Sequence, residues 1–478
     1  MGGSIRNYNK QITNRLPVDP HHTSPFPRTQ HILGVLAKIS FFATLVLMPV
    51  RMRIVLLARP NGALYRDYTD FLLFIPDITL LVTLTAWGLV KFADRKPIRF
   101  GPAYVWIPLA GLTVAGLLSV VFSVDRSLSL FNAIRLGVLF LFYLYVVNEK
   151  ISIIWITAAI ALQGAFQAIV AVAQSVNQRS IGLQVLGEHV LDPLTAGVSI
   201  VSDGSTRFLR AYGLTDHPNI LGGCLAFGLL ILLTVYLQSE PKNSLVVGVA
   251  FVLMCVALLL TFSRAAWLVF LTGSTLIVGL DAWFRQRKNL KPVLSLMLST
   301  CFVLLPFLVV NIKYLGARLN VGQSFENIRV ESQSVNERAF LNQSANQIFV
   351  KHPLTGIGLS ASPVAMKNEY PEFPTYYQPP HFVLLAVALE TGMFGATFYF
   401  LLMALPWIVL LRHKRTWTNP NLIGAAGLLL AVTVVGFFDY YTWFSTAGRL
   451  WQWLAWGLFA VAIDSPLPQG EGLGVREK

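Results

Sequence analysis

The run NILGGCLAFGLLILLTVYL, residues 219–237, decides the fold class of this 478-residue chain. It has no charged residue, and about 20 consecutive apolar residues are enough for a helix to cross the hydrocarbon core of a bilayer. The whole chain is 55% hydrophobic and only 13% charged, about half the charged share of an ordinary soluble domain. A disordered chain and a simple soluble enzyme are therefore excluded.

Similar apolar runs recur along the sequence, about twelve in all by the same length criterion. Because a backbone in lipid must satisfy its own hydrogen bonds, each run is predicted to be a helix. The runs are 33–50, 71–92, 103–123, 131–147, 151–174, 219–237, 245–262, 265–284, 293–312, 382–411, 422–438 and 450–463. The sequence thus predicts an all-α, polytopic membrane protein with about twelve transmembrane helices.

Basic residues predict the orientation of these helices. The short segments after the second, eighth and tenth runs are dense in Lys and Arg, as cytoplasmic loops are, so both termini are predicted to be cytoplasmic. A loop as long as the one before the tenth helix is usually functional. The predicted organisation is a cytoplasmic tail at 1–32, transmembrane helices 1–9 at 33–312 with an outer loop at 175–218, a large helical outer loop at 313–380, transmembrane helices 10–12 at 381–463, and a cytoplasmic tail at 464–478.

The charge balance and the cysteines exclude several kinds of partner. The excess of 37 Lys and Arg over 23 Asp and Glu is explained by topology, so no nucleic-acid partner is expected. Cys224, Cys255 and Cys301 lie far apart inside apolar runs and predict neither a disulfide framework nor a metal site. The sequence also has no Walker loop, HExxH or DxD motif, which argues against ATP-driven transport and metal-dependent transfer from nucleotide sugars. No metal or cofactor is implied.

The segment RFLRAYGLTDHPNILGG, residues 207–223, contains the first candidate site residues. Pro218 and Asn219 stand at a predicted helix start, where free backbone N–H groups favour an anion. Arg210 lies just ahead of that helix, and His217 and Asn219 are candidate binding residues beside it. The segment predicts a phosphate site, and the alternative is an interfacial arginine whose head group reaches lipid phosphates.

Arg264, in TFSRAAWLVF, separates two apolar runs with almost no loop around it. A tight turn does not require an arginine, and a cation near the hydrocarbon is costly unless it faces a cavity or a partner. Arg264 is therefore a second candidate for an anion site. The alternative is an exposed turn residue.

His381, in QPPHFVLLAVALETGMFG, ends the long loop and begins the tenth run. Imidazole exchanges a proton near neutral pH, so His381 is a candidate general base for a hydroxyl. The alternative is a helix cap. Glu390 follows within the apolar run and is a candidate substrate-binding residue by virtue of its place in the membrane. Pairing with an arginine inside the bundle is the interpretation we favour for it.

Further polar and aromatic residues are less specific. Asp77 and Arg135 are predicted to pair with each other as a structural tie. Arg449 is a candidate substrate-binding residue at the end of DYYTWFSTAGR, residues 439–449, an aromatic turn that suits an interfacial belt or a substrate wall. Aromatic residues near the end of the long loop either stack on sugar rings or anchor at the interface, and we favour anchoring. They are Tyr370, Phe373, Tyr376 and Tyr377.

The order of these elements resembles the O-antigen ligase and Wzy-type polymerase family, which builds bacterial surface polysaccharides. The resemblance covers most of the chain. It is carried by LRAYGLTDHPNILGG, TFSRAAW, ERAFLNQSANQIFVKHPLTGIG (residues 337–358), QPPHFVLLAVALETGMFG and DYYTWFSTAGRLWQW. Each motif is short, and the signal comes from five of them in the same order.

The resemblance implies a membrane glycosyltransferase of the bacterial inner membrane that acts on the periplasmic side. Its donor would be a glycan on undecaprenyl diphosphate, and its acceptor lipid A core or a growing glycan chain. Arg210 and Arg264 correspond to arginines that hold the diphosphate, and His381 to the histidine that activates the acceptor hydroxyl, with no nucleotide or metal. Family members often have Asn after this histidine, where this chain has Phe382.

Two other functions compete with this interpretation. A secondary transporter or flippase of polysaccharide precursors is suggested by twelve spans and by Asp77, Arg135 and Glu390. Such transporters often show paired halves with broken helices, a symmetry that this sequence lacks. A purely structural membrane anchor would tolerate the loss of Arg210, Arg264 and His381.

Overall fold

The structure is a computed structural model of the chain. It describes residues 27–149, 151–202, 206–238, 241–285, 290–319, 325–374, 376–412 and 417–464. Of the tails expected at 1–32 and 464–478, residues 1–26 and 465–478 lie outside this described part. Residues 27–32 were expected to belong to the N-terminal tail, but they form the start of helix α1.

The fold is all-α, and ten helices in the described part of the chain are long and apolar enough to cross a membrane. They are α1 (Pro27–Leu47), α2 (Ile75–Asp94), α3 (Ala103–Ser119), α4 (Arg126–Glu149), α5 (Ile153–Asn177), α6 (Pro218–Tyr236), α8 (Arg264–Phe284), α9 (Leu290–Val310), α13 (Val383–Arg412) and α14 (Pro420–Phe438). Two further helices, α7 (Pro241–Leu260) and α16 (Thr446–Asp464), pack among them. The predicted polytopic membrane fold is confirmed.

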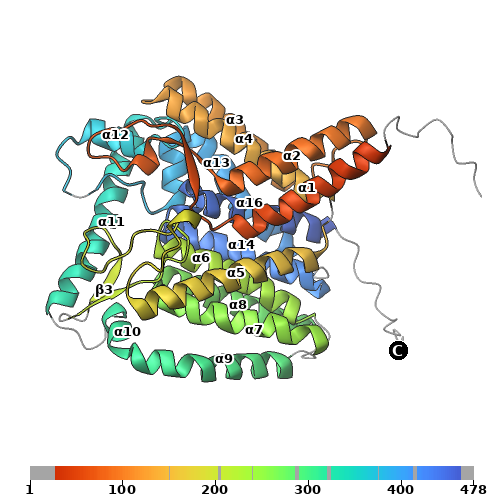
Figure 1. Cartoon of the computed structure of the whole chain (residues 1–478). Helices are drawn as coiled ribbons and strands as arrows, with labels where there is room; N and C mark the ends of the chain where they lie inside the picture. Colours follow the sequence, from red (N-terminus) through yellow and green to blue (C-terminus); the bar gives the residue numbers. More distant parts are fainter. Residues whose placement is uncertain are drawn as a thin grey trace, which may run out of the picture.

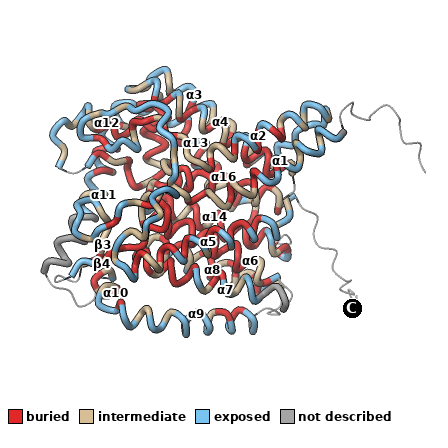
Figure 2. The backbone as a smooth tube through the Cα atoms, in the orientation of Figure 1, coloured by how far each residue is buried: buried red, intermediate tan, exposed pale blue. Residues whose placement is uncertain are grey.

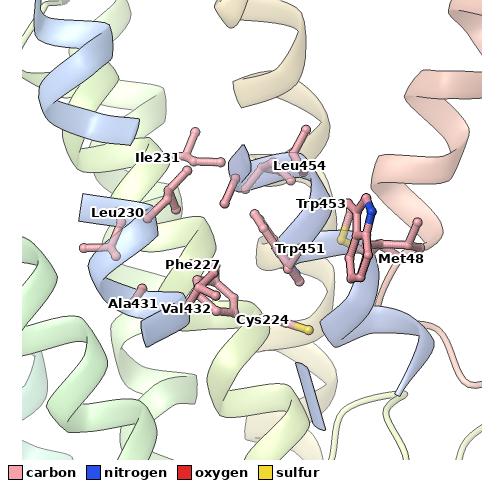
Figure 3. Packing of buried hydrophobic residues seen from close by; sticks show 14 of the residues in the cluster. Met48, Cys224, Phe227, Leu230, Ile231, Ala431, Val432, Trp451, Trp453 and Leu454 are labelled. Atoms are coloured by element: carbon pink, nitrogen blue, oxygen red, sulfur yellow. The ribbon is translucent and has the colours of Figure 1, made fainter. Parts of the chain in front are cut away.

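The bundle is organised around α6. This helix is 83% buried, whereas α9 at the periphery is 17% buried, and buried residues accordingly gather at the centre of the molecule (Figure 2). Phe227 of α6 packs against Trp451 of α16 with ring centroids 5.5 Å apart (Figure 3). Large aromatic side chains such as these bury the most apolar surface per residue and so contribute strongly to packing.

One predicted helix begins later than expected. Residues 71–74 of the run 71–92 form strand β2 (Phe71–Phe74), which pairs antiparallel with β1 (Arg53–Leu57), so the helical prediction was wrong there. The helix starts at Ile75 because the Phe74 N–H donates to the Asp77 carboxylate (3.1 Å) and Pro76 supplies a first turn that needs no N–H donor. A second hairpin, β3 (Ile200–Ser202) and β4 (Arg207–Leu209), lies in the first outer loop.

The large loop before α13 is helical, as predicted. It contains α10 (Ile312–Arg318), α11 (Phe325–Lys351) and α12 (Ser362–Glu369), which lie with β3 at one end of the bundle (Figure 1). We call this the loop end. A separate hydrophobic core fills it, formed by Leu64, Leu128, Leu341, Ala345, Ile348, Ile357, Ala361, Val364, Ala365, Met366, Tyr377 and Leu389. The β1–β2 connection and α13 both contribute to this core, which fixes the loop onto the bundle.

Helix α13 is interrupted at Gly392, more than two turns after its start at Val383. Gly392 has φ +68°, a left-handed conformation that favours glycine. The Ile357 and Gly358 N–H groups donate to the carbonyl oxygens of Leu389 (2.9 Å) and Glu390 (3.0 Å), which the interruption leaves unbonded within the helix. The interruption therefore anchors the segment after α11 to the membrane bundle.

Candidate active site

A short turn connects α7 to α8, and arginines gather around it. Phe262 has a left-handed backbone (φ +49°) that reverses the chain within this turn. Arg264 is the first residue of α8 and is partly exposed. Arg210 donates from Nε to the Thr261 carbonyl oxygen (2.7 Å), and Arg318 donates from Nε to the Phe262 carbonyl oxygen (2.9 Å). The turn therefore holds Arg210, Arg264 and Arg318 close together.

Arg210 begins a chain of buried polar contacts. It is 5% exposed and follows β4, and its Nη2 donates to Asn219 Oδ1 (2.6 Å). Asn219 Nδ2 in turn donates to Asp439 Oδ2 (2.8 Å). Asn219 lies in the first turn of α6, as predicted, and Asp439 directly follows α14. This network ties the outer loop to two helices and gives the Arg210 cation a nearby carboxylate.

His217 is the N-cap of α6. Its Nδ1 accepts from the Asn219 N–H (3.1 Å), and its Nε2 lies 2.9 Å from Ser199 Oγ. Burial lowers the pKa of His217 well below its ordinary value, and the Arg210 charge adds to this effect. A neutral imidazole with both nitrogens engaged orients Asn219, and through it Arg210.

His381 lies immediately before the first turn of α13. It is 8% exposed, its N–H donates to Asn342 Oδ1 (2.8 Å), and its ring meets Tyr440 edge-on with centroids 4.9 Å apart. Burial lowers the pKa of His381 to about 4, with Asp439 opposing the shift and Arg338 adding to it. Its buried Nδ1 has no hydrogen-bond partner among the described residues. A neutral imidazole in this state has the capacity to accept a proton.

Two residues of α11 that the single motifs did not reveal face the same site. Arg338 acts electrostatically on His217, His381 and Tyr440, so its guanidinium is close enough to all three for its charge to affect their pKa values. Asn342 holds the His381 backbone. The two are four residues apart on one helix and so share a face, and this spacing within ERAFLNQ is the signal that could have found them.

The electrostatics of His217 place two other predicted residues, Arg210 and His381, near it. Arg210, Arg338, His381 and Arg318 all lower its pKa, after the larger effect of burial. The loop end thus brings Arg210, His217 and His381 together in a cationic environment. Arg264 lies near Arg210 because Arg210 and Arg318 both donate to the turn that precedes Arg264, and Arg264 itself donates to the Arg318 carbonyl oxygen.

Glu390 and Arg449 lie in a different buried cluster, around α15 (Tyr441–Phe444). Trp443 Nε1 donates to Glu390 Oε2 (2.9 Å), and Arg449 Nε donates to the Trp443 carbonyl oxygen. Arg449 also donates to Ser360 Oγ (3.1 Å). Both predicted residues therefore support the segment that carries Tyr440, and no hydrogen bond among the described residues joins them to His381.

Two other sequence expectations concern contacts outside the site. Arg135 and Asp77 form the predicted ion pair, with Nη2 and Oδ2 2.8 Å apart, so two of the charges that suggested a transporter neutralise each other. Phe382 stacks on Phe437 with centroids 5.6 Å apart. Where family members often have a polar side chain, this chain thus makes an apolar contact between α13 and α14.

Comparison with known proteins finds one matching family model. Residues 249–400 match a family model described as O-antigen ligase. Over this stretch, the chain is similar to the O-antigen ligase family. The family predicted from the motifs is thereby confirmed. No curated protein matches the chain.

The O-antigen ligase stretch begins within α7 and ends within α13. It contains Arg264, Arg338 and His381, whereas Arg210 and Asp439 lie on either side of it. The family implies an O-antigen ligase- or polymerase-type enzyme of the bacterial inner membrane. In this chain, the candidate site is completed by segments before and after the matched stretch.

Proposed function

We propose that this protein transfers a glycan from undecaprenyl diphosphate to an acceptor hydroxyl on the periplasmic face of the inner membrane. The acceptor would be lipid A core if the enzyme is a ligase, or a growing glycan chain if it is a polymerase. The observation that carries the proposal is the position of Arg210 and Arg264 around one turn, in the same cationic environment as the buried, neutral His381.

The arginines are proposed to bind the diphosphate of the donor. As the glycosidic bond breaks, the leaving diphosphate gains negative charge, and preorganised guanidiniums stabilise that charge more in the transition state than in the ground state. Arg210 is held on two sides, by Thr261 and Asn219, so little reorganisation is needed when the charge develops. Guanidiniums in this role do what a divalent cation does in other transferases, which makes the proposed reaction metal-independent.

His381 is proposed to be the general base. It takes the proton of the acceptor hydroxyl while the oxygen forms a bond to the anomeric carbon, and the bond from that carbon to the diphosphate oxygen breaks. Attack from the face opposite the leaving group inverts the anomeric centre. The Asp439 carboxylate raises the pKa of His381 and so favours the imidazolium that forms during this step.

The test is transfer by the purified protein in detergent micelles. Undecaprenyl-diphosphate-linked O-antigen is supplied as donor and O-antigen-free lipopolysaccharide as acceptor, with and without a chelator. We expect ligated product, and a loss of about a hundredfold or more in rate for Arg264→Ala. Arg207→Ala, at an exposed position on β4, is the matched control and should retain the rate.

A transporter or flippase gives a different result in this assay. Micelles have no compartments, so a pure transporter forms no covalent product. Full transfer by Arg264→Ala would exclude the proposed diphosphate contact, and the absence of product with either acceptor class, lipopolysaccharide or a repeat-unit glycan, would exclude the proposed function.

A further inference from the structure

A row of tyrosine rings leads from the surface of the loop end to His381. The Tyr376 and Tyr65 ring centroids are 5.2 Å apart, and those of Tyr65 and Tyr68 are 6.1 Å apart. The hydroxyls of Tyr68 and Tyr440 are 2.9 Å apart, and Tyr440 contacts the His381 ring. We call Tyr376, Tyr65, Tyr68 and Tyr440 the tyrosine row.

Exposure falls along the tyrosine row towards the candidate base. Tyr376 is 55% exposed and Tyr65 is 41% exposed, whereas His381 is 8% exposed. The next residue in the loop, Tyr377, is not exposed in this way: it is buried and stacks on Phe373 with ring centroids 4.9 Å apart. Packing of the loop therefore explains Tyr377 but not the two exposed rings.

The segment that presents Tyr65 is held in place on both sides. The adjacent Leu64 is 6% exposed and belongs to the hydrophobic core of the loop end. Lys367 of α12 donates to the Asn61 carbonyl oxygen (3.0 Å), and the Asp70 carboxylate accepts from the Arg59 N–H (2.6 Å). An aromatic face fixed in this way loses little conformational entropy when a ligand covers it.

Polar groups flank the tyrosine row on the side of α11. Glu337 acts electrostatically on Tyr65, and Arg338 acts on Tyr440. Burial, with Tyr376 and Glu337 nearby, raises the pKa of Tyr65 to about 12, so its hydroxyl stays protonated at neutral pH. Flat aromatic faces with a few converging polar groups suit a ligand that has an apolar ring face and hydroxyls at its edge.

From this arrangement we infer that the tyrosine row is the acceptor subsite, in which Tyr65 and Tyr376 stack on pyranose rings of the acceptor glycan and direct its hydroxyl to His381. The inference rests on the proposed glycan transfer. The acceptor is favoured over the donor glycan because the row ends at the candidate base, whereas Arg210, Arg264 and Arg318 gather around the α7–α8 turn.

The test measures steady-state constants for Tyr65→Leu and Tyr376→Leu, which keep apolar bulk but lose the aromatic face. Transfer is followed while O-antigen-free lipopolysaccharide and the lipid-linked donor are varied in turn. A stacked ring contributes enough for about a 3- to 10-fold rise in the acceptor KM per substitution, with kcat and the donor KM within twofold. Tyr65→Phe keeps the face and should restore the wild-type KM. Phe122→Leu, at a 58% exposed aromatic between α3 and α4, is the control.

Each other outcome overturns the inference. An unchanged acceptor KM in both leucine variants removes the subsite, and a rise in the donor KM alone assigns these rings to the donor glycan. Loss of thermal stability with an unchanged KM assigns them a structural role.

A binding experiment separates this inference from the proposed function. Core oligosaccharide freed of lipid A is added to the His381→Ala protein, and saturation transfer from protein to sugar is measured by NMR. Transfer that is lost in the His381→Ala, Tyr65→Leu double variant supports the subsite even if no enzymatic product is ever found. Transfer that is equal in both proteins, or absent from both, overturns it, whatever the activity of the wild-type enzyme.

Discussion

Replacing Arg210 with Lys tests whether the two-sided hold on this side chain matters beyond its charge. The guanidinium donates from Nε to Thr261 and from Nη2 to Asn219. The lysine side chain ends in a single ammonium group, which cannot reproduce both contacts. Losing one charge-assisted hydrogen bond of a side chain that is 5% exposed costs about 1.5–3 kcal/mol of stability. If the same group stabilises the leaving diphosphate, the rate falls by about 100- to 1,000-fold.

The assay combines thermal unfolding in detergent with transfer measured on protein that is still folded. Arg207→Lys is the matched control, since Arg207 is exposed on β4, the strand that Arg210 directly follows, and it should change neither quantity. A rate within about threefold of wild type for folded Arg210→Lys would refute the reasoning, because the charge alone would then suffice. A fall in stability with no fall in rate would leave Arg210 only a structural tie.

Three further predictions concern the carboxylate, the histidine and the helix interruption. Asp439→Asn removes the negative charge that raises the pKa of His381, so we expect the rate of transfer to fall about 10- to 100-fold, while circular dichroism shows the fold intact. The pKa of His381 is about 4 in the folded protein, below its ordinary value of 6.5, so the unfolded state binds the proton first as the pH falls. The free energy of unfolding is therefore full above about pH 6.5 and falls by on the order of 3 kcal/mol towards pH 4. His381→Gln should reduce this loss in acid unfolding curves. Gly392→Ala forces a Cβ against the Leu354 carbonyl oxygen at φ +68°, so thermal unfolding should show a loss of about 1–3 kcal/mol or more, and unchanged stability would contradict the described interruption.

The apolar runs predicted most of the fold because lipid leaves few alternatives to a helix. Residues 71–74 differ from the prediction, since four apolar residues suit a strand as well as a helix turn. What decided between them was the Asp77 carboxylate, which accepts from the Phe74 N–H and starts α2 later than the hydropathy suggests. The helical loop between α9 and α13 was visible in its composition, but its separate core was not, because that core includes Leu64 and Leu389 from distant segments.

The candidate site was predicted in part for a similar reason. Arg210, Arg264 and His381 stand out in a sequence because a cation or imidazole beside an apolar run needs an explanation. Arg338 and Asn342 lie on a polar helix where such residues are ordinary, so only the fold reveals that they face His381. Glu390 and Arg449 were conspicuous for their burial, and the structure brings them to Trp443 instead.

The turn between α7 and α8 sets the spacing of the arginines at the loop end. Arg210 and Arg318 are bonded to its carbonyl oxygens and Arg264 belongs to the helix that it starts, so inserting one residue there would displace all three guanidiniums at once. An engineer who wishes to accommodate a differently spaced anion would therefore alter this connection, and would leave the arginines themselves untouched.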